Sequence, residues 1–304
     1  ILEVHARNKK LAADADLGAI ARRTPGFSGA DLENVLNEAA ILAVRVNKNE
    51  ISMHELDEAI DRVMMGPAKK SRVYSEKEKK LVAYHETGHA IIGIKLESAD
   101  MVQKVTIIPR GEAGGYNLML PREENNYIIT KTDLIGKITG LLGGRVAEEI
   151  VFGEISTGAS NDIERATQIA RSIVMVYGMS SLGPIQYDNP QGNVFLGRDY
   201  ANTQSYSGEI AYEIDKEVRK IIDEAHANAT AIISENKELM DRIANALMIY
   251  ETLTQEDIKD LTEGRELTKP VVDRKNEPKR EPAQGTPIPE EDEKPTAEDL
   301  NNID

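Results

Sequence analysis

The run His85-Glu86-Thr87-Gly88-His89 constrains the fold of this chain more than any other feature of its sequence. Two histidines four residues apart lie on one face of an α-helix, about one turn from each other. There, both imidazoles can reach the same zinc ion. Apolar residues flank the run, with Leu81-Val82-Ala83-Tyr84 before it and Ala90-Ile91-Ile92 after it. The sequence therefore predicts a largely buried helix that carries half of a tetrahedral metal site.

Glu86 is the predicted catalytic base of this site. It follows the first histidine directly, so its carboxylate can reach a zinc-activated water without itself binding the metal. Zinc lowers the pKa of such a water to roughly 7 and polarises a scissile carbonyl. Glu86 would accept the proton of the water and pass it to the leaving amine. The pattern thus predicts a zinc endopeptidase, although two histidines on an amphipathic surface helix would also satisfy it.

A third protein ligand must come from elsewhere in the sequence. The chain has no cysteine, which excludes thiolate sites and disulfides, and fits a reducing compartment. His5, His54 and His226 lie in the first segment or in a polar helical stretch, so a carboxylate is favoured. The candidate carboxylates are Glu112 in a Gly-rich loop, Glu148 and Glu149 on a predicted helix, and Asp162 in the first turn of the next helix. Residue chemistry alone leaves Asp162 and Glu149 nearly equal, because a first-turn aspartate also has a capping role.

The remaining pattern predicts a mainly α fold with a small β-sheet. Residues 1–66 are expected to form a small helical unit, and residues 67–264 a second, mostly helical domain. Its predicted elements are a helix of about 20 residues from Ser75, strands at Met101–Pro109 and Tyr116–Leu120, and a set of later helices. These helices cover Thr132 to about Val151 with an interruption at Gly143-Gly144, Ser160–Tyr177, about Gly208–Tyr250, and a short one from Thr254.

Composition narrows the classes of partner. The formal net charge of −15 argues against nucleic acid, whose phosphates require clustered Lys and Arg. The sequence contains no uninterrupted stretch of about 18 apolar residues and therefore predicts no transmembrane helix. This piece is expected to be soluble. The chain begins at Ile1 and resembles an excised part of a longer protein. Residues 265–304 combine repeated prolines with dense, largely acidic charge, which predicts a disordered tail.

Three separated motifs resemble one known family. His85–His89, Gly143–Glu149 and the Thr-Gly-Ala-Ser-Asn-Asp stretch at 157–162 are similar to the peptidase domain of FtsH-type ATP-dependent zinc metalloproteases. Thr24–Leu32, with the sequence Thr-Pro-Gly-Phe-Ser-Gly-Ala-Asp-Leu, resembles the helical lid of the AAA+ ATPase module in that family. Together the similarity covers about residues 1–264.

The resemblance implies that Asp162 is the third zinc ligand and that Glu148 and Glu149 support the site. It also implies a homohexamer that uses ATP and magnesium to unfold membrane and cytosolic proteins before cleaving them. The full-length protein would lie at the cytoplasmic face of the cell membrane, anchored by N-terminal segments outside this chain. No phosphate-binding Gly-x-x-x-x-Gly-Lys-Ser/Thr loop is present, so this piece supplies only lid contacts to a nucleotide, around Gly29 and Ala30.

Two other hypotheses remain at the level of sequence. A helical assembly module would use the lid-like segment and the long C-terminal helices for protein contacts, with a purely structural His85–His89 run. A metal-dependent hydrolase would bind zinc but act on something other than peptides. An exposed strand near Val105–Pro109 or Tyr116–Leu120 favours a peptidase, since main-chain hydrogen bonds bind unfolded chains with little sequence selectivity.

Overall fold

Four helices form the N-terminal part of the computed structural model, which describes residues 1–69, 74–111, 113–122, 128–187 and 206–269. They are α1 (Leu2–Ala6), α2 (Leu17–Arg23), α3 (Gly29–Arg45) and α4 (Met53–Met65). Capping boxes start the two longest, in which Ser28 pairs with Asp31 and Ser52 pairs with Glu55. Their own apolar core includes Ile20, Leu36, Leu56 and Ile60. The helical structure predicted for residues 1–66 is therefore present.

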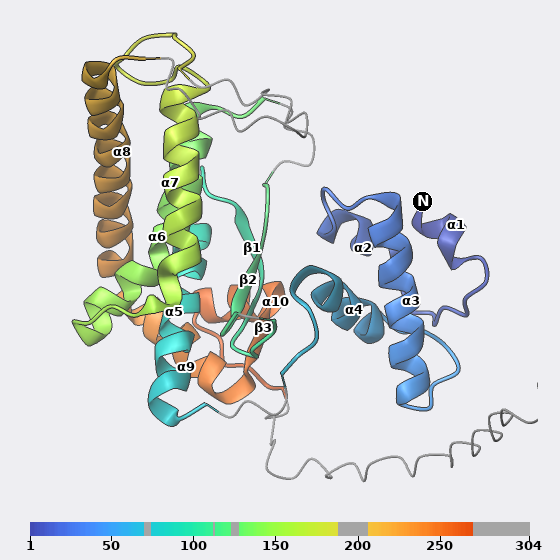
Figure 1. Cartoon of the computed structure of the whole chain (residues 1–304). Helices are drawn as coiled ribbons and strands as arrows, with labels where there is room; N and C mark the ends of the chain where they lie inside the picture. Colours follow the sequence, from blue (N-terminus) through green and yellow to red (C-terminus); the bar gives the residue numbers. More distant parts are fainter. Residues whose placement is uncertain (70–73, 112, 123–127, 188–205, 270–304) are drawn as a thin grey trace, which may run out of the picture. The chain divides into compact units, whose positions relative to one another are not determined.

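A single central helix, α5 (Glu76–Lys95), carries the His85–His89 run. It begins at the predicted capping box of Ser75 and Glu78 and is buried continuously from Ala83 to Gly93. A helix buried on all sides must pack against several neighbours. Its neighbours are α6 (Lys131–Phe152), α8 (Gly208–Glu235), α9 (Lys237–Tyr250) and the sheet, as Figure 1 also shows.

The sheet has three antiparallel strands in the order β2-β1-β3. These are β1 (Met101–Thr106), β2 (Tyr116–Leu120) and β3 (Thr252–Thr254). The register pairs Met101 with Leu120 and Val105 with both Asn117 and Leu253. Within this sheet β2 is an edge strand, with one side of its backbone not paired to another strand. The sequence predicted β2 correctly, placed the end of β1 three residues too late, and missed β3.

The remaining helices complete the part of the fold that follows α4. In Figure 1, α6, α7 (Ser160–Met175) and α8 run side by side, with a second apolar core between them. The short helix α10 (Gln255–Thr262) follows β3 and starts from a capping box of Thr254 and Asp257. A 3-10 turn at Thr157–Ala159 leads into α7. The mainly α fold class with a small sheet is confirmed.

The predicted interruption of α6 at Gly143-Gly144 is wrong. The helix is continuous from Lys131 to Phe152, and the two glycines lie inside it. They are needed because α5 and α6 cross there with backbones in contact. A Cβ on Gly88 would lie 2.2 Å from the carbonyl oxygen of Gly143, and a Cβ on Gly143 would lie 2.7 Å from that of Gly88. The glycines therefore permit a close helix crossing rather than a break.

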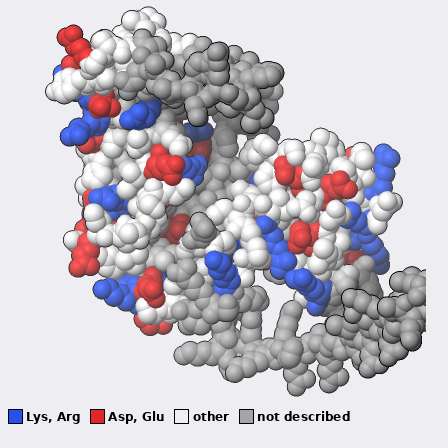
Figure 2. Space-filling view, in the orientation of Figure 1, with Lys and Arg blue, Asp and Glu red and all other residues white. Residues whose placement is uncertain are grey.

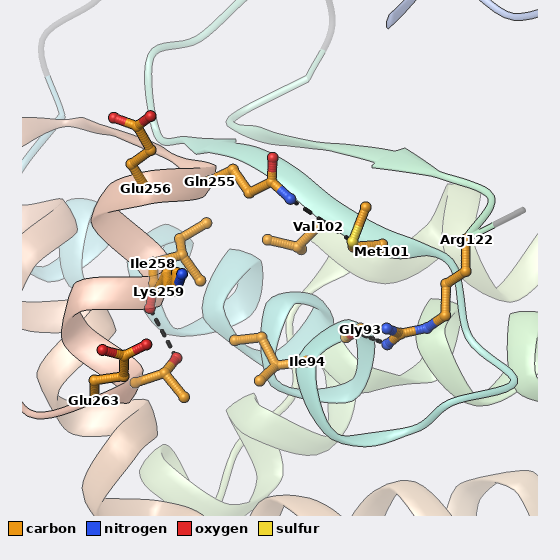
Figure 3. Close-up of a pocket in the computed structure, with 11 residues that line it drawn as sticks. Gly93, Ile94, Met101, Val102, Arg122, Gln255, Glu256, Ile258, Lys259 and Glu263 are labelled. Atoms are coloured by element: carbon orange, nitrogen blue, oxygen red, sulfur yellow. Dashed lines mark hydrogen bonds between the residues drawn. The ribbon is translucent and has the colours of Figure 1, made fainter. Parts of the chain in front are cut away.

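Arg122 anchors the C-terminal end of α5. Its guanidinium donates hydrogen bonds to the carbonyl oxygens of Gly93 at 2.6 Å, Ala99 at 3.2 Å and Leu96 at 3.3 Å. The bond to Gly93 satisfies a carbonyl in the last turn of the helix, where carbonyls lack helical partners. Figure 3 shows Arg122 reaching Gly93 beside a cavity of about 470 Å³ between α5, β1 and α10. No residue of the His85–His89 run lines this cavity.

Charged side chains on the face drawn in Figure 2 are of both signs and lie interspersed, with uncharged areas between them. In the described parts of the chain, no helix is both long enough and apolar enough to span a bilayer. The predictions for Glu112 and for the tail from residue 270 onward lie outside the described residues.

Candidate metal centre

His85, Glu86 and His89 lie on the buried part of α5 and line the same cleft. Their exposed fractions are 8%, 6% and 9%. The helix places the two imidazoles next to each other, with an Nε2 to Nε2 distance of 3.2 Å. The predicted local geometry is therefore present: two potential ligands lie one turn apart, and a carboxylate adjoins them in the same cleft.

Asp162 completes a group of three potential ligands. It lies in the first turn of α7, and its Oδ2 is 3.4 Å from Nε2 of His85 and 3.5 Å from Nε2 of His89. Bonds of about 2.0–2.2 Å to a tetrahedral zinc ion separate the ligand atoms by roughly 3.3–3.6 Å. Two nitrogens and one carboxylate oxygen at these separations therefore fit zinc with its fourth position open. Together, His85, His89 and Asp162 form a possible metal-binding group.

Hydrogen bonds on the far side of each ring direct both Nε2 atoms to this group. Nδ1 of His85 lies 2.7 Å from Oε1 of Glu148, and Nδ1 of His89 lies 2.8 Å from the carbonyl oxygen of Gly140. Both partners can only accept a hydrogen bond, so each Nδ1 carries the proton and each Nε2 can offer a lone pair. Glu148 is itself held by the backbone N–H of Ser156, at 2.7 Å from its Oε2. Glu148 thus orients the ring of His85.

Glu149 is not part of the three-residue group. Glu149 pairs with Arg145 at 3.1 Å and with Nε2 of His226 at 3.0 Å. It follows Glu148 on α6 by one residue, and a step of about 100° around the helix turns its side chain away from His85. This helical geometry favours Asp162 over Glu149 as the third ligand.

The carboxylate of Asp162 and the imidazole of His85 strongly influence each other. Burial opposes ionisation of Asp162, but hydrogen bonds with both histidines prevail and hold its pKa well below the usual range. Burial likewise favours a neutral His85, yet its bonds with Asp162 and Glu148 raise its pKa to about 10. In the metal-free protein at neutral pH, His85 is therefore protonated.

Zinc binding is expected to release this proton, because a ligating Nε2 must be deprotonated. The raised pKa means that the proton is held at pH 7 and lost only near pH 10, so zinc affinity should rise with pH. Release of one proton makes the apparent dissociation constant fall about tenfold per pH unit between pH 7 and 9. Isothermal titration calorimetry in buffers of different ionisation enthalpy measures the number released. Glu148→Gln should release fewer protons, and zinc binding without proton release in the unaltered protein contradicts the assignment.

Because Gly144 has no side chain, the two imidazoles have room beside α6. A Cβ at this position would lie 2.6 Å from Cε1 of His85 and 2.6 Å from Nε2 of His89. Gly144→Ala is therefore expected to displace the rings and weaken zinc binding by roughly 10–100-fold, the usual cost of disturbing the groups that orient metal ligands. Gly140→Ala on the same helix is the matched control, since a Cβ there meets nothing within 4 Å. Competition with a chromophoric chelator measures both affinities, and equal values would contradict this role of Gly144.

Glu86 is surrounded by groups that affect its ionisation in opposite directions. Burial raises its pKa, whereas the neighbouring imidazoles of His85 and His89 and a hydrogen bond from Asn117 lower it, with a net increase. Such a carboxylate is poised to accept a proton. Asn117, on β2, was missed by reasoning from sequence, although an amide within Tyr116–Leu120 is the only polar side chain between apolar neighbours.

A cleft of about 1390 Å³ opens over these residues. Its lining includes α5, the edge strand β2, the glycines Gly114 and Gly115, and the start of α7. A cleft of this size accommodates several residues of an extended polypeptide, and β2, at the edge of the sheet formed by the described residues, lines it.

Comparison with known proteins agrees with this geometry. Residues 72–261 match peptidase family M41, and residues 14–58 match the AAA+ lid domain. Proteins described as ATP-dependent zinc metalloprotease FtsH are similar to most of the chain. Those of Bacillus subtilis and Alkalihalophilus pseudofirmus are each 59% identical, over 86% and 87% of this chain, and that of Acholeplasma laidlawii is 58% identical over 86%.

The chain spans about two fifths of the length of these relatives, 41%, 39% and 41% respectively. The peptidase match covers most of the sequence, including α5, the sheet and the three-residue group. From this match, the chain belongs to peptidase family M41.

Proposed function

We propose that this chain is the protease part, with an adjoining lid, of an ATP-dependent zinc endopeptidase. The observation that carries the proposal is the triangle of His85, His89 and Asp162 with Glu86 beside it in an open cleft. His85, His89 and Asp162 would hold the metal, and Glu86 would act as general base. When bound there, zinc supplies Lewis acidity toward water and the scissile carbonyl.

The residues of the chain would divide the proton transfers between them as follows. Glu86 accepts the proton of the attacking water at its carboxylate and delivers it to the nitrogen of the leaving amine. Its raised pKa favours the first transfer and still permits the second. Glu148 keeps the proton on Nδ1 of His85 throughout, so that Nε2 remains a ligand. The buried position of Glu86 limits competition from bulk water.

The substrate would be unfolded protein, bound in extended form along β2. Main-chain hydrogen bonds to an edge strand do not depend on the side chains of the bound segment.

The AAA+ lid match and the names of the relatives support an ATP-driven assembly. We propose boundaries at residues 1–66 for the lid, 67–264 for the peptidase and 265–304 for the tail. In the whole protein, Gly29 and Ala30 at the start of α3 would contact the nucleotide, with magnesium and the phosphate-binding loop supplied outside this chain. The assembly would be a homohexamer anchored at the cytoplasmic face of the membrane, taking up damaged membrane and cytosolic proteins.

Incubation of the purified chain with casein tests the peptidase function. New fragments that disappear with a chelator and return with zinc are expected. Bound zinc without fragments would favour a hydrolase of another substrate class. A protein that neither contains zinc nor takes it up, but assembles normally, would favour the helical assembly module.

A further inference from the structure

The amide of Asn117 makes two hydrogen bonds to the same residue. Its Nδ2 donates to Oε2 of Glu86 at 2.6 Å and to the main-chain carbonyl oxygen of Glu86 at 3.0 Å. A carboxylate oxygen and a carbonyl oxygen can only accept, so the amide nitrogen must face Glu86 and Oδ1 must face away. The orientation of the amide therefore follows from the chemistry of its partners.

The strand that carries Asn117 is held rigidly against α5. Asn117 pairs with Val105 in the sheet, and Met119, two residues along on the same face of β2, lies against Gly93 of α5. Gly115, just before β2, lies close to the side chain of Glu86. A Cβ there would lie 2.9 Å from both Cγ and Oε1 of Glu86. The carboxylate is thus confined between the amide of Asn117 and the backbone of Gly115.

Confinement matters because a flexible side chain must be held in place to act as a base. A glutamate side chain has three rotatable bonds, and a general base must lie within hydrogen-bond reach of the proton that it removes. Displacements of about 1 Å in such groups can cost about 100-fold in rate. A hydrogen bond to an ionised carboxylate is stronger and shorter than one between neutral groups, which makes Nδ2 an effective anchor.

We propose that Asn117 is a positioning residue for catalysis, which fixes the Glu86 carboxylate toward the metal centre through its Nδ2 donor. This inference rests on the proposed peptidase function and on Glu86 as its base. Asn117 acts through Glu86, so its removal changes the rate of the chemical step while zinc ligation and binding of the peptide main chain remain.

Two substitutions separate positioning from packing. Asn117→Ala removes the donor and is expected to lower kcat by roughly tenfold or more with KM little changed. Asn117→Asp keeps the shape but places a carboxylate oxygen where the donor was, 2.6 Å from Oε2 of Glu86. Two carboxylates at that separation repel or share a proton, so this isosteric variant should be less active than the alanine variant. A side chain that only fills space would give the opposite order, and that order overturns the proposal.

The same pair of side chains can be tested without measuring activity. Asn117→Asp is expected to lower the Tm of the zinc-loaded protein, and to lower it much less in a Glu86→Gln background, where the Gln amide can donate to the new carboxylate. An equal decrease in both backgrounds contradicts the inference. The visible spectrum of the cobalt-substituted variants should match that of the parent, which establishes intact ligands.

Failure of the inference is distinguishable from failure of the proposed function. If the parent chain cleaves casein with a zinc requirement but the aspartate variant retains more activity than the alanine variant, only the role of Asn117 is wrong. If the parent chain cleaves no peptide, the peptidase proposal itself is wrong.

Discussion

Replacement of Glu86 by Gln is expected to lower kcat for peptide cleavage by roughly 10²–10⁴-fold, the usual contribution of a positioned general base. The carboxamide has nearly the same shape but cannot take a proton from water at neutral pH. Glu86 is not one of the three residues of the metal-binding group, so the zinc content of the variant should remain near that of the unaltered protein. Initial rates on a fluorogenic peptide, with metal analysis of the same sample, measure both quantities.

The separation of activity from metal content is what makes this variant informative. A helix that lost its packing at the buried Glu86 would lose zinc and activity together, and circular dichroism would reveal the change. Retained turnover with intact structure would exclude Glu86 as the base. Another group in the cleft would then have to act as the base. One such group is the hydroxyl of Tyr74, which donates to the carbonyl oxygen of Gly114 at 2.8 Å.

Replacement of Asp162 by Asn is expected to cause the largest loss of zinc affinity. It removes the anionic oxygen that lies 3.4 and 3.5 Å from the two imidazole nitrogens. Disturbing a group that only orients a ligand already costs about 10–100-fold in affinity, so loss of a ligand itself should exceed roughly 100-fold. Activity should decrease in parallel, and excess zinc should restore part of it. Competition against a series of chelators measures the affinity.

Glu149→Gln is the matched control for Asp162→Asn. Both substitutions replace a carboxylate by an amide, and both residues are sequence candidates for the third ligand. Glu149 pairs with Arg145 on α6 and with His226 on α8, and these side chains are 27–37% exposed. Partly exposed pairs of this kind contribute about 1 kcal/mol, so zinc affinity should hardly change. Strong loss in the Glu149 variant and none in the Asp162 variant would reverse the assignment.

Position on a helix decides the outcome for Glu148 and Glu149, which the sequence could not separate. Adjacent residues on α6 point in directions about 100° apart. One carboxylate therefore orients His85 at 2.7 Å, while the other lies among surface charges. The sequence predicted a helix here, but which of its faces meets α5 depends on the crossing that Gly88 and Gly143 permit. That crossing is a contact between residues far apart in the chain.

Local features were determined by the sequence alone. Capping residues and apolar spacing predicted the starts of α5 and α10, because a cap and its helix lie within a few residues of each other. The pairing of His85 with His89, and the place of Glu86 beside them, also follow from the helical repeat. Strand β3 was missed because a three-residue strand has little pattern of its own and forms only by pairing with β1.

Only the tertiary structure decided which distant groups complete the centre. Asp162 meets the two histidines because α7 begins beside α5, and Asn117 meets Glu86 because β2 is held beside the same helix by its pairing with β1. Neither contact has a signature in local spacing. Helical and strand periodicity specify the direction of a side chain relative to its own element, whereas the packing of those elements depends on the whole core.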